Sequence, residues 1–127
     1  MNYTFSIKPC AEPITIVGNI QSFKIIAEYM RGFLSSEASD FSFFIDDTKY
    51  PKFHIQSGFG LTIISEIKGT GIVMKGDKRY FELFLMFFEH FGNYDEPIGP
   101  ESRGCIDPKV HSDYIKDTSI RIGFQLV

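Results

Sequence analysis

Two cysteines, Cys10 and Cys105, and three histidines, His54, His90 and His111, are the residues that could supply a nucleophilic pair. A catalytic thiol needs an activating context, such as a glycine-flanked turn that leads into a helix, and neither cysteine has one. Two cysteines are also too few for a disulfide scaffold or a cysteine-based zinc site. We therefore expect free thiols and no catalytic residue.

The histidines could bind a metal together with Asp107 or Asp113. His54 falls in a predicted strand, His90 on a predicted helix and His111 in a predicted loop. The HxxxH and HExxH spacings, which place two imidazoles on one face of a helix, are both absent. We expect neither a metal site nor a cofactor.

Neighbouring carboxylates and short glycine motifs give no stronger signal. Asp46-Asp47 and Asp95-Glu96 could share a proton or hold a hard cation, but only in a cleft that removes water from them. The Gly-x-Gly pieces at 58–60 and 69–71 do not open a helix, so hairpin turns explain them better than a phosphate cradle. No motif predicts an enzyme.

Two segments predict the helices that must position any site. Apolar residues recur at helical spacing through Ile20–Leu34, and Asn19 or Ser22 can cap this helix. Asp77 can cap a second helix that runs to about Phe91 and is apolar nearly all the way round. Such a helix must be buried on more than one side, either between two elements of this chain or against another chain.

Strands are predicted at 3–8, 14–17, 41–45, 53–56, 61–67, 71–75 and 119–127. The short spacings in the middle of the chain favour antiparallel hairpins. Residues 92–118 carry no sustained periodicity and predict a long loop, and no internal repeat is visible. The order of elements predicts an α+β fold, a mainly antiparallel sheet with two helices packed on one face, in a single domain of residues 1–127.

Composition narrows the possible partners. The net charge of −3 and the pI of about 5.5 argue against direct binding of nucleic acid. No uncharged apolar stretch approaches the roughly 18 residues of a membrane span, and the first residues do not form a secretory signal. We expect a cytoplasmic protein without a membrane partner.

The middle of the chain has a recognisable sequence of elements. A strand ends in Ile16-Val17-Gly18-Asn19, a helix Ser22–Leu34 contains Ile26-Ala27-Glu28, and a meander follows over Phe53–Lys75. Residues 14–91 thereby resemble small bacterial immunity proteins, the antidotes encoded beside polymorphic and contact-dependent toxins. The resemblance implies a non-enzymatic cytoplasmic protein that neutralises one cognate toxin by occluding its active site.

Acidic residues in predicted loops, with aromatic residues beside them, are the candidate contacts for such a partner, because binding groups concentrate in loops. An acidic surface would speed the encounter with a basic, nuclease-like toxin. The predicted partner-binding residues are Asp46, Asp47, Tyr50, Phe59, Tyr94, Asp95, Glu96, Glu101, Asp107 and Asp113.

Two alternatives stay open. One is a homo-oligomeric structural or regulatory domain that dimerises through the aromatic helix Tyr80–Phe91, since clustered aromatic residues suit an interface. The other is a domain that binds a small apolar ligand in a phenylalanine-walled pocket between the sheet and the second helix.

Overall fold

The computed structural model describes residues 3–8, 13–44, 53–58, 71–99, 102–107 and 121–127, and the backbone alone of 61–67. These residues contain two helices and eight strands. They are β1 (Phe5–Lys8), β2 (Ile14–Gly18), α1 (Ile20–Leu34), β3 (Asp40–Phe43), β4 (Phe53–Ser57), β5 (Leu61–Ile67), β6 (Gly71–Gly76), α2 (Lys78–Gly92), β7 (Arg103–Ile106) and β8 (Ile122–Leu126).

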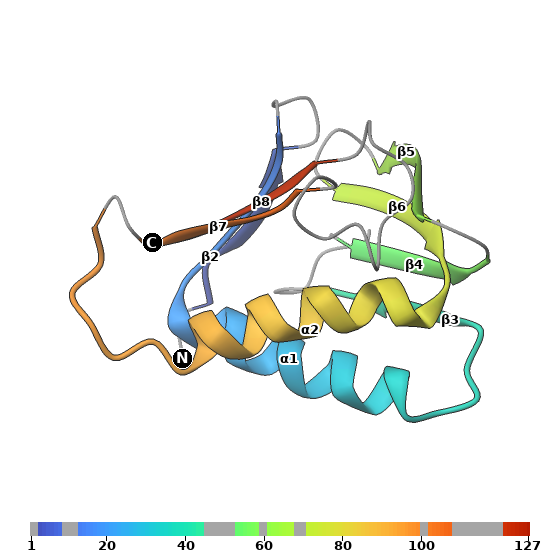
Figure 1. The fold of residues 1–127 in the computed structure, drawn as a ribbon, viewed down its shortest axis with the longest axis horizontal. Helices are drawn as coiled ribbons and strands as arrows, with labels where there is room; N and C mark the ends of the chain where they lie inside the picture. Colours follow the sequence, from blue (N-terminus) through green and yellow to red (C-terminus); the bar gives the residue numbers. More distant parts are fainter. Residues whose placement is uncertain are drawn as a thin grey trace.

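The strands form two sheets, and the helices lie side by side and antiparallel against them (Figure 1). One sheet has the order β1-β2-β8-β7 and the other β3-β4-β6-β5. The predicted α+β class and the predominance of antiparallel pairs are confirmed. The expectation of one sheet is corrected to two, because β1, β2, β7 and β8 meet from opposite parts of the chain, while the four consecutive strands β3–β6 form a sheet of their own.

A parallel pair lies at the centre of each sheet. Strand β2 pairs with β8, and β4 pairs with β6, both in parallel, while the outer pairs are antiparallel. The predicted hairpin between β5 and β6 is confirmed, but the expected pairing of β4 with β5 was wrong. Strand β5 lies at the edge of its sheet, and β6 lies between β4 and β5. The segment that connects β4 to β6 includes β5, and it is long enough to join two parallel strands.

Strand β7 was missed, because residues 92–118 were expected to be a long loop. Its sequence Arg-Gly-Cys-Ile has no alternation of polar and apolar residues and contains a glycine. Pairing with β8 stabilises it as a strand, and this tertiary contact outweighs its weak local preference. The terminal strand was predicted correctly and lies in the interior of its sheet.

Both helices begin at the predicted caps. The Asn19 carboxamide oxygen accepts a hydrogen bond from the Ser22 backbone N–H at 3.0 Å, and the Asp77 carboxylate accepts one from the Arg79 N–H at 3.0 Å. Each bond satisfies a backbone donor that the first turn of a helix leaves free. Neither of the two described helices is long and apolar enough to cross a bilayer.

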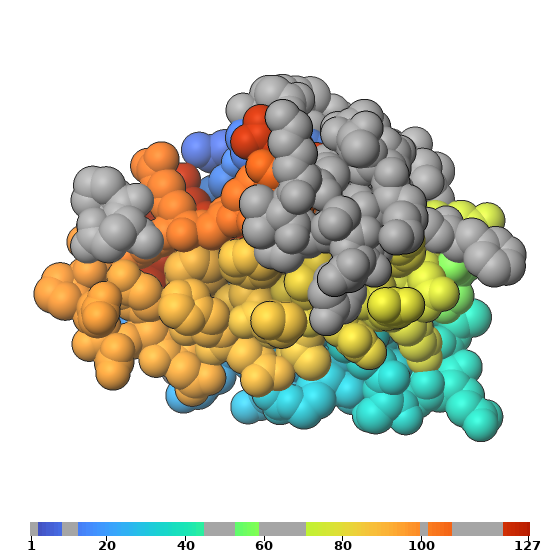
Figure 2. All heavy atoms as spheres, viewed as in Figure 1, coloured from blue at the N-terminus to red at the C-terminus, as the bar shows by residue number. Residues whose placement is uncertain are grey.

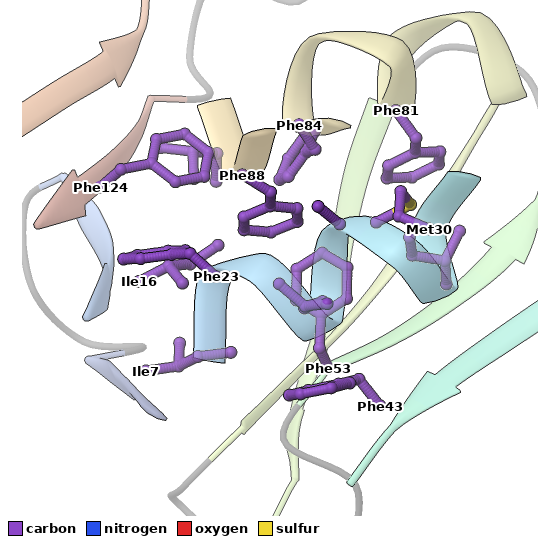
Figure 3. Close-up of a cluster of buried hydrophobic side chains, with 14 of the residues drawn as sticks. Ile7, Ile16, Phe23, Met30, Phe43, Phe53, Phe81, Phe84, Phe88 and Phe124 are labelled. Carbon is purple, nitrogen blue, oxygen red and sulfur yellow. The ribbon is translucent and has the colours of Figure 1, made fainter. Parts of the chain in front are cut away.

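The apolar circumference of α2 is explained by burial on two sides within this chain. Helix α1 covers one side, and phenylalanines of both sheets cover another (Figure 3). The Phe84 ring lies 5.9 Å from the ring of Phe53 on β4 and 5.9 Å from that of Phe124 on β8. All three side chains are almost completely buried, so α2 joins the two sheets into one core.

The pairing pattern of one sheet recurs in the other. In each, two antiparallel hairpins flank a central parallel pair, and a helix follows one of the two central strands. No repeat is visible in the sequence, and the two parts have few residues in common, but the two sheets have the same topology.

Candidate partner-binding surface

Four of the ten predicted partner-binding residues lie in the described part of the chain. Tyr94, Asp95 and Glu96 follow α2 directly and are brought together beside that helix. Asp107 follows β7, is partly buried and lies apart from them, near Cys105. The other six, Asp46, Asp47, Tyr50, Phe59, Glu101 and Asp113, lie outside the described residues.

Tyr94, Asp95 and Glu96 form one end of an open groove of about 920 Å³ along the outward face of α2. We call this the α2 groove; its described lining is Glu82, Leu85, Met86, Glu89, His90, Asn93, Tyr94, Asp95 and Glu96. Figure 2 shows α2, in yellow, and the residues after it, in orange, as one continuous exposed surface. Glu82, Met86 and His90, four residues apart along α2, are all exposed.

The middle of the α2 groove is apolar. Met86 is 62% exposed, an unusual state for a large apolar side chain, and Leu85 beside it is partly buried. The Tyr94 ring is partly buried and packs against Phe91 and His90. These three side chains, Leu85, Met86 and Tyr94, provide a surface that an apolar group of a partner could cover.

The rim of the groove is acidic. Glu82, Glu89, Asp95 and Glu96 contribute four carboxylates, and no lysine or arginine is among the described residues that line it. Arg31 of α1 approaches Glu89, with its Nη2 3.3 Å from the carboxylate Oε1. Both side chains of this pair are about half exposed, so solvent screens the contact and the rim keeps most of its negative potential.

Hydrogen bonds fix the chain that carries Asp95 and Glu96. The fully buried Ser102 hydroxyl donates to the Tyr94 hydroxyl at 2.9 Å and accepts from the Gly99 N–H at 3.1 Å. The Ser102 carbonyl accepts from the Leu126 N–H of β8 at 3.0 Å. These bonds join Tyr94 and Gly99 to Ser102, and Ser102 to the sheet, so the two acids are held beside the helix.

The sequence reasoning missed the part of the groove that lies on α2 itself. Glu82, Leu85, Met86, Glu89 and Asn93 recur at helical spacing and share one face. That spacing could have shown an acidic helical face next to the acids of the following loop. No local signal could have shown Ser102, because a serine in a polar stretch looks the same whether buried or exposed.

A serine and a histidine come close elsewhere. The Ser42 Oγ lies 2.6 Å from the His54 Nδ1, and the two residues are direct neighbours in the β3–β4 register. Ser42 is exposed, whereas a nucleophilic serine needs a sheltered site with donors for an oxyanion. The geometry is that of a cross-strand hydrogen bond on the outer surface of a sheet.

The remaining chemistry is sparse in the described ranges. No group of three or more His, Cys, Asp or Glu in them could hold a metal ion. Cys105 is a free thiol. Burial raises the pKa of this thiol; the Arg121 guanidinium opposes the rise and the Asp107 carboxylate adds to it. A raised pKa leaves less of the reactive thiolate, the opposite of what a nucleophile needs.

The predicted apolar pocket between sheet and helix is filled by side chains of the chain itself. Phe53, Phe84, Phe88 and Phe124 occupy the space between α2 and the strands, each at most 1% exposed (Figure 3). Close packing of these rings argues against a small apolar ligand at this place.

Comparison of the chain with protein-family models, with curated protein sequences and with solved structures found no match.

Proposed function

We propose that this chain is a non-enzymatic binding protein that holds a basic protein partner in the α2 groove. The observation that carries the proposal is the groove itself, with four carboxylates around an apolar floor of Leu85 and Met86. Acidic groups and apolar surface in one groove suit a protein partner. The acidic rim accelerates the encounter with a basic protein, and the apolar floor supplies affinity when the partner covers it.

The geometry restricts what the partner presents. Along α2, Glu82 and Asn93 are separated by three turns, or roughly 16 Å at 1.5 Å per residue. Asp95 and Glu96 extend the acidic rim beyond the end of the helix. A complementary surface has an apolar side chain in the middle, over Met86, and lysine or arginine on both sides of it.

The resemblance of residues 14–91 to small immunity proteins suggests a particular version of this function. In that version the partner is a cognate basic toxin, such as a nuclease, and the bound protein occludes its active site in the cytoplasm. Acidic groups held on a rigid helix and a fixed loop could occupy the sites where such an enzyme binds phosphates.

The first experiment is a pull-down of the tagged protein from its native host, with the adjacent open reading frames co-expressed and the bound proteins identified by mass spectrometry. We expect one stoichiometric basic partner whose association rate falls as salt rises. Failure to retain a basic protein at low salt would contradict the proposal, and a basic partner without toxic activity would remove the toxin version alone.

A matched pair of variants tests whether the α2 groove is the contact. Asp95→Asn with Glu96→Gln removes two charges from the groove, and we expect the Kd to rise by about tenfold, or roughly 1.4 kcal/mol. Glu37→Gln with Asp40→Asn removes two exposed acids, one in the connection after α1 and one at the start of β3, that do not line the groove. This control pair should change the Kd by less than about twofold; equal effects of both pairs would place the contact elsewhere.

Met86 supports a second candidate, self-association through the predicted segment Tyr80–Phe91. Its exposed thioether group is an apolar contact on the outward face. Phe81, Phe84 and Phe88 are engaged in the core, so a dimer would use Leu85 and Met86, and Glu82 and Glu89 of two copies would meet. Light scattering at micromolar concentration tests this: a dimer that Met86→Glu dissociates supports it, and a monomer excludes it at that concentration.

A further inference from the structure

We infer that the chain consists of two copies of one ββαββ unit, residues 5–57 and 61–126, each of which docks on the other about an internal twofold axis. The first unit is β1-β2-α1-β3-β4 and the second is β5-β6-α2-β7-β8. Exchanging the units converts the order β1-β2-β8-β7 into β5-β6-β4-β3, which is the second sheet read from its other edge.

The strand register obeys the same exchange, apart from one irregularity in β5 between Ile63 and Ser65. Strand β2 corresponds to β6, 58 residues later. Gly18 of β2 pairs with Leu126, and its counterpart Gly76 of β6 pairs with Ser57. The Gly18 carbonyl accepts from the Val127 N–H at 2.9 Å, and the Gly76 carbonyl accepts from the Gly58 N–H at 2.9 Å.

A second pair of hydrogen bonds repeats at the other hairpins. The Ser57 N–H at the end of β4 donates to the Ser39 carbonyl at 2.8 Å, and the Leu126 N–H at the end of β8 donates to the Ser102 carbonyl at 3.0 Å. Each acceptor directly precedes the first residue of β3 or β7. Two unrelated halves would have no reason to share register and connecting bonds.

The helices follow the same relation. Both have 15 residues, both follow a glycine and a capping residue, and Phe23 and Phe33 recur as Phe81 and Phe91. They pack antiparallel, the arrangement that a twofold axis perpendicular to the two helices produces (Figure 1).

The ion pair between α1 and α2 joins equivalent positions. Arg31 and Glu89 are 58 residues apart, the same separation that relates α1 to α2. A self-complementary contact of this kind is characteristic of a twofold interface.

The surface between the two units shows that each unit is shaped to pack against the other. It consists of the α1–α2 contact and the parallel pairs β2–β8 and β4–β6, and all three join one unit to the other. Within a unit, strands pair only as the antiparallel hairpins in the described residues. Each unit therefore leaves a central strand edge and a helix face that a second copy of the unit covers.

The chain ends occupy the position that corresponds to the link between the units. The Thr4 carbonyl accepts from the Asn19 N–H at 3.0 Å, and the Gly18 carbonyl accepts from the Val127 N–H, so Thr4 and Val127 flank the end of β2. They are two strand spacings apart, or about 10 Å. At the other unit, Gly58 and Leu61 both contact Gly76 at the end of β6, and only two residues separate them in the sequence.

A circular permutant of the full chain tests the inference. It begins at Gly60, runs to Val127, continues directly from Met1 and ends at Phe59. Met1–Thr4 then connect Val127 to Phe5, where two residues suffice in the natural link. Because the order of two equivalent units is immaterial, we expect a monomer with the circular dichroism of the parent and a Tm within about 10 °C of it.

A second permutant provides the control. It begins at Glu37 and ends at Ser36, in the exposed connection between α1 and β3, and so opens a unit instead of separating two. We expect it to melt at least about 5 °C below the first permutant. A first permutant that fails to fold, or that is no more stable than the control, would overturn the inference. Neither result bears on the proposed partner.

Discussion

The two units have the same register but different interiors. Where α1 places Ile26, Ala27 and Met30, the equivalent positions of α2 are Phe84, Leu85 and Phe88. Phe84 and Phe88 of α2 contact Phe53 of one sheet and Phe124 of the other. Helix α1 also contacts both sheets, with a smaller number of large side chains, through Phe23 against Phe5 and Phe33 against Phe41. The comparison teaches that one register tolerates different side-chain volumes, provided that the two units complement each other across their interface.

The surfaces of the units differ more than their interiors. The connection from helix to strand covers residues 35–39 in the first unit and 93–102 in the second, and the additional residues form one end of the α2 groove. Lys24 and Arg31 of α1 correspond to Glu82 and Glu89 of α2. A shared frame thus carries a face with two bases and Glu28 on α1 and an acidic groove on α2.

The largest expected effect is at the aromatic centre of the second unit. Phe84→Ala removes a ring that contacts Phe53, Phe81, Phe88 and Phe124, and we expect the free energy of unfolding to fall by about 3–5 kcal/mol. Urea denaturation followed by circular dichroism measures this loss.

The equivalent truncation in the first unit is the comparison for Phe84→Ala. Ile26→Ala removes fewer buried atoms, so it should cost about 1 kcal/mol less than Phe84→Ala. An equal or larger loss for Ile26→Ala would show that the interior of the first unit contributes at least as much to stability as that of the second.

Replacing two helical glycines with alanine should change the stability in opposite directions. At Gly92 a Cβ would lie 2.9 Å from the Lys24 Cα, so Gly92→Ala forces the helices apart and should cost about 1–3 kcal/mol. At Gly32 of α1 a Cβ would meet nothing within 4 Å, so Gly32→Ala should stabilise by about 0.5–1 kcal/mol. Thermal melts of both variants decide the signs, and a neutral Gly92→Ala would mean that the helix pair adjusts freely.

Ser102 and Ser39 accept equivalent backbone bonds, but their hydroxyl groups have different surroundings. Ser102→Ala removes the bonds to Tyr94 and Gly99, and we expect a loss of about 1 kcal/mol together with weaker partner binding. Ser39 is exposed, so Ser39→Ala should stay within about 0.5 kcal/mol of the parent. Similar losses for both would show that the hydroxyl of Ser102 does not secure the loop.

The smallest expected effect concerns Cys105, whose equivalent in the first unit is the exposed Ser42. In a Cys10→Ser background, the pH midpoint of Cys105 alkylation should lie above that of a free thiol, because burial disfavours the thiolate. Asp107→Asn should lower this midpoint, since the Asp107 carboxylate also raises the pKa. An unchanged midpoint in Asp107→Asn would remove that carboxylate as a cause.

The raised pKa of Cys105 also determines how this thiol makes the stability of the protein depend on pH. The folded state holds the Cys105 proton more tightly than the unfolded chain, so its contribution to stability is complete below the unfolded pKa. That contribution is lost as the pH rises through the higher folded pKa. Denaturation midpoints compared with those of Cys105→Ser over this alkaline range measure the loss.

By itself, the sequence determined the local structure of this protein. Asn19 and Asp77 predict where the two helices begin, because a capping side chain bonds to the backbone only a few residues away. The helical stripes and the alternation in the last strand are also local, so the α+β class could be predicted. Tyr94, Asp95 and Glu96 were recognised as neighbours because they are adjacent in the chain.

Only the tertiary structure decided which elements meet. Strand β7 depends on β8 for its conformation, and the parallel pairs join strands that local patterning cannot match. Only the folded chain brings Glu82 and Glu89 of α2 together with Asp95 in one groove, and only the folded chain buries Ser102. Periodicity tells which face of an element is buried, but the partner that buries it is chosen by packing over the whole chain.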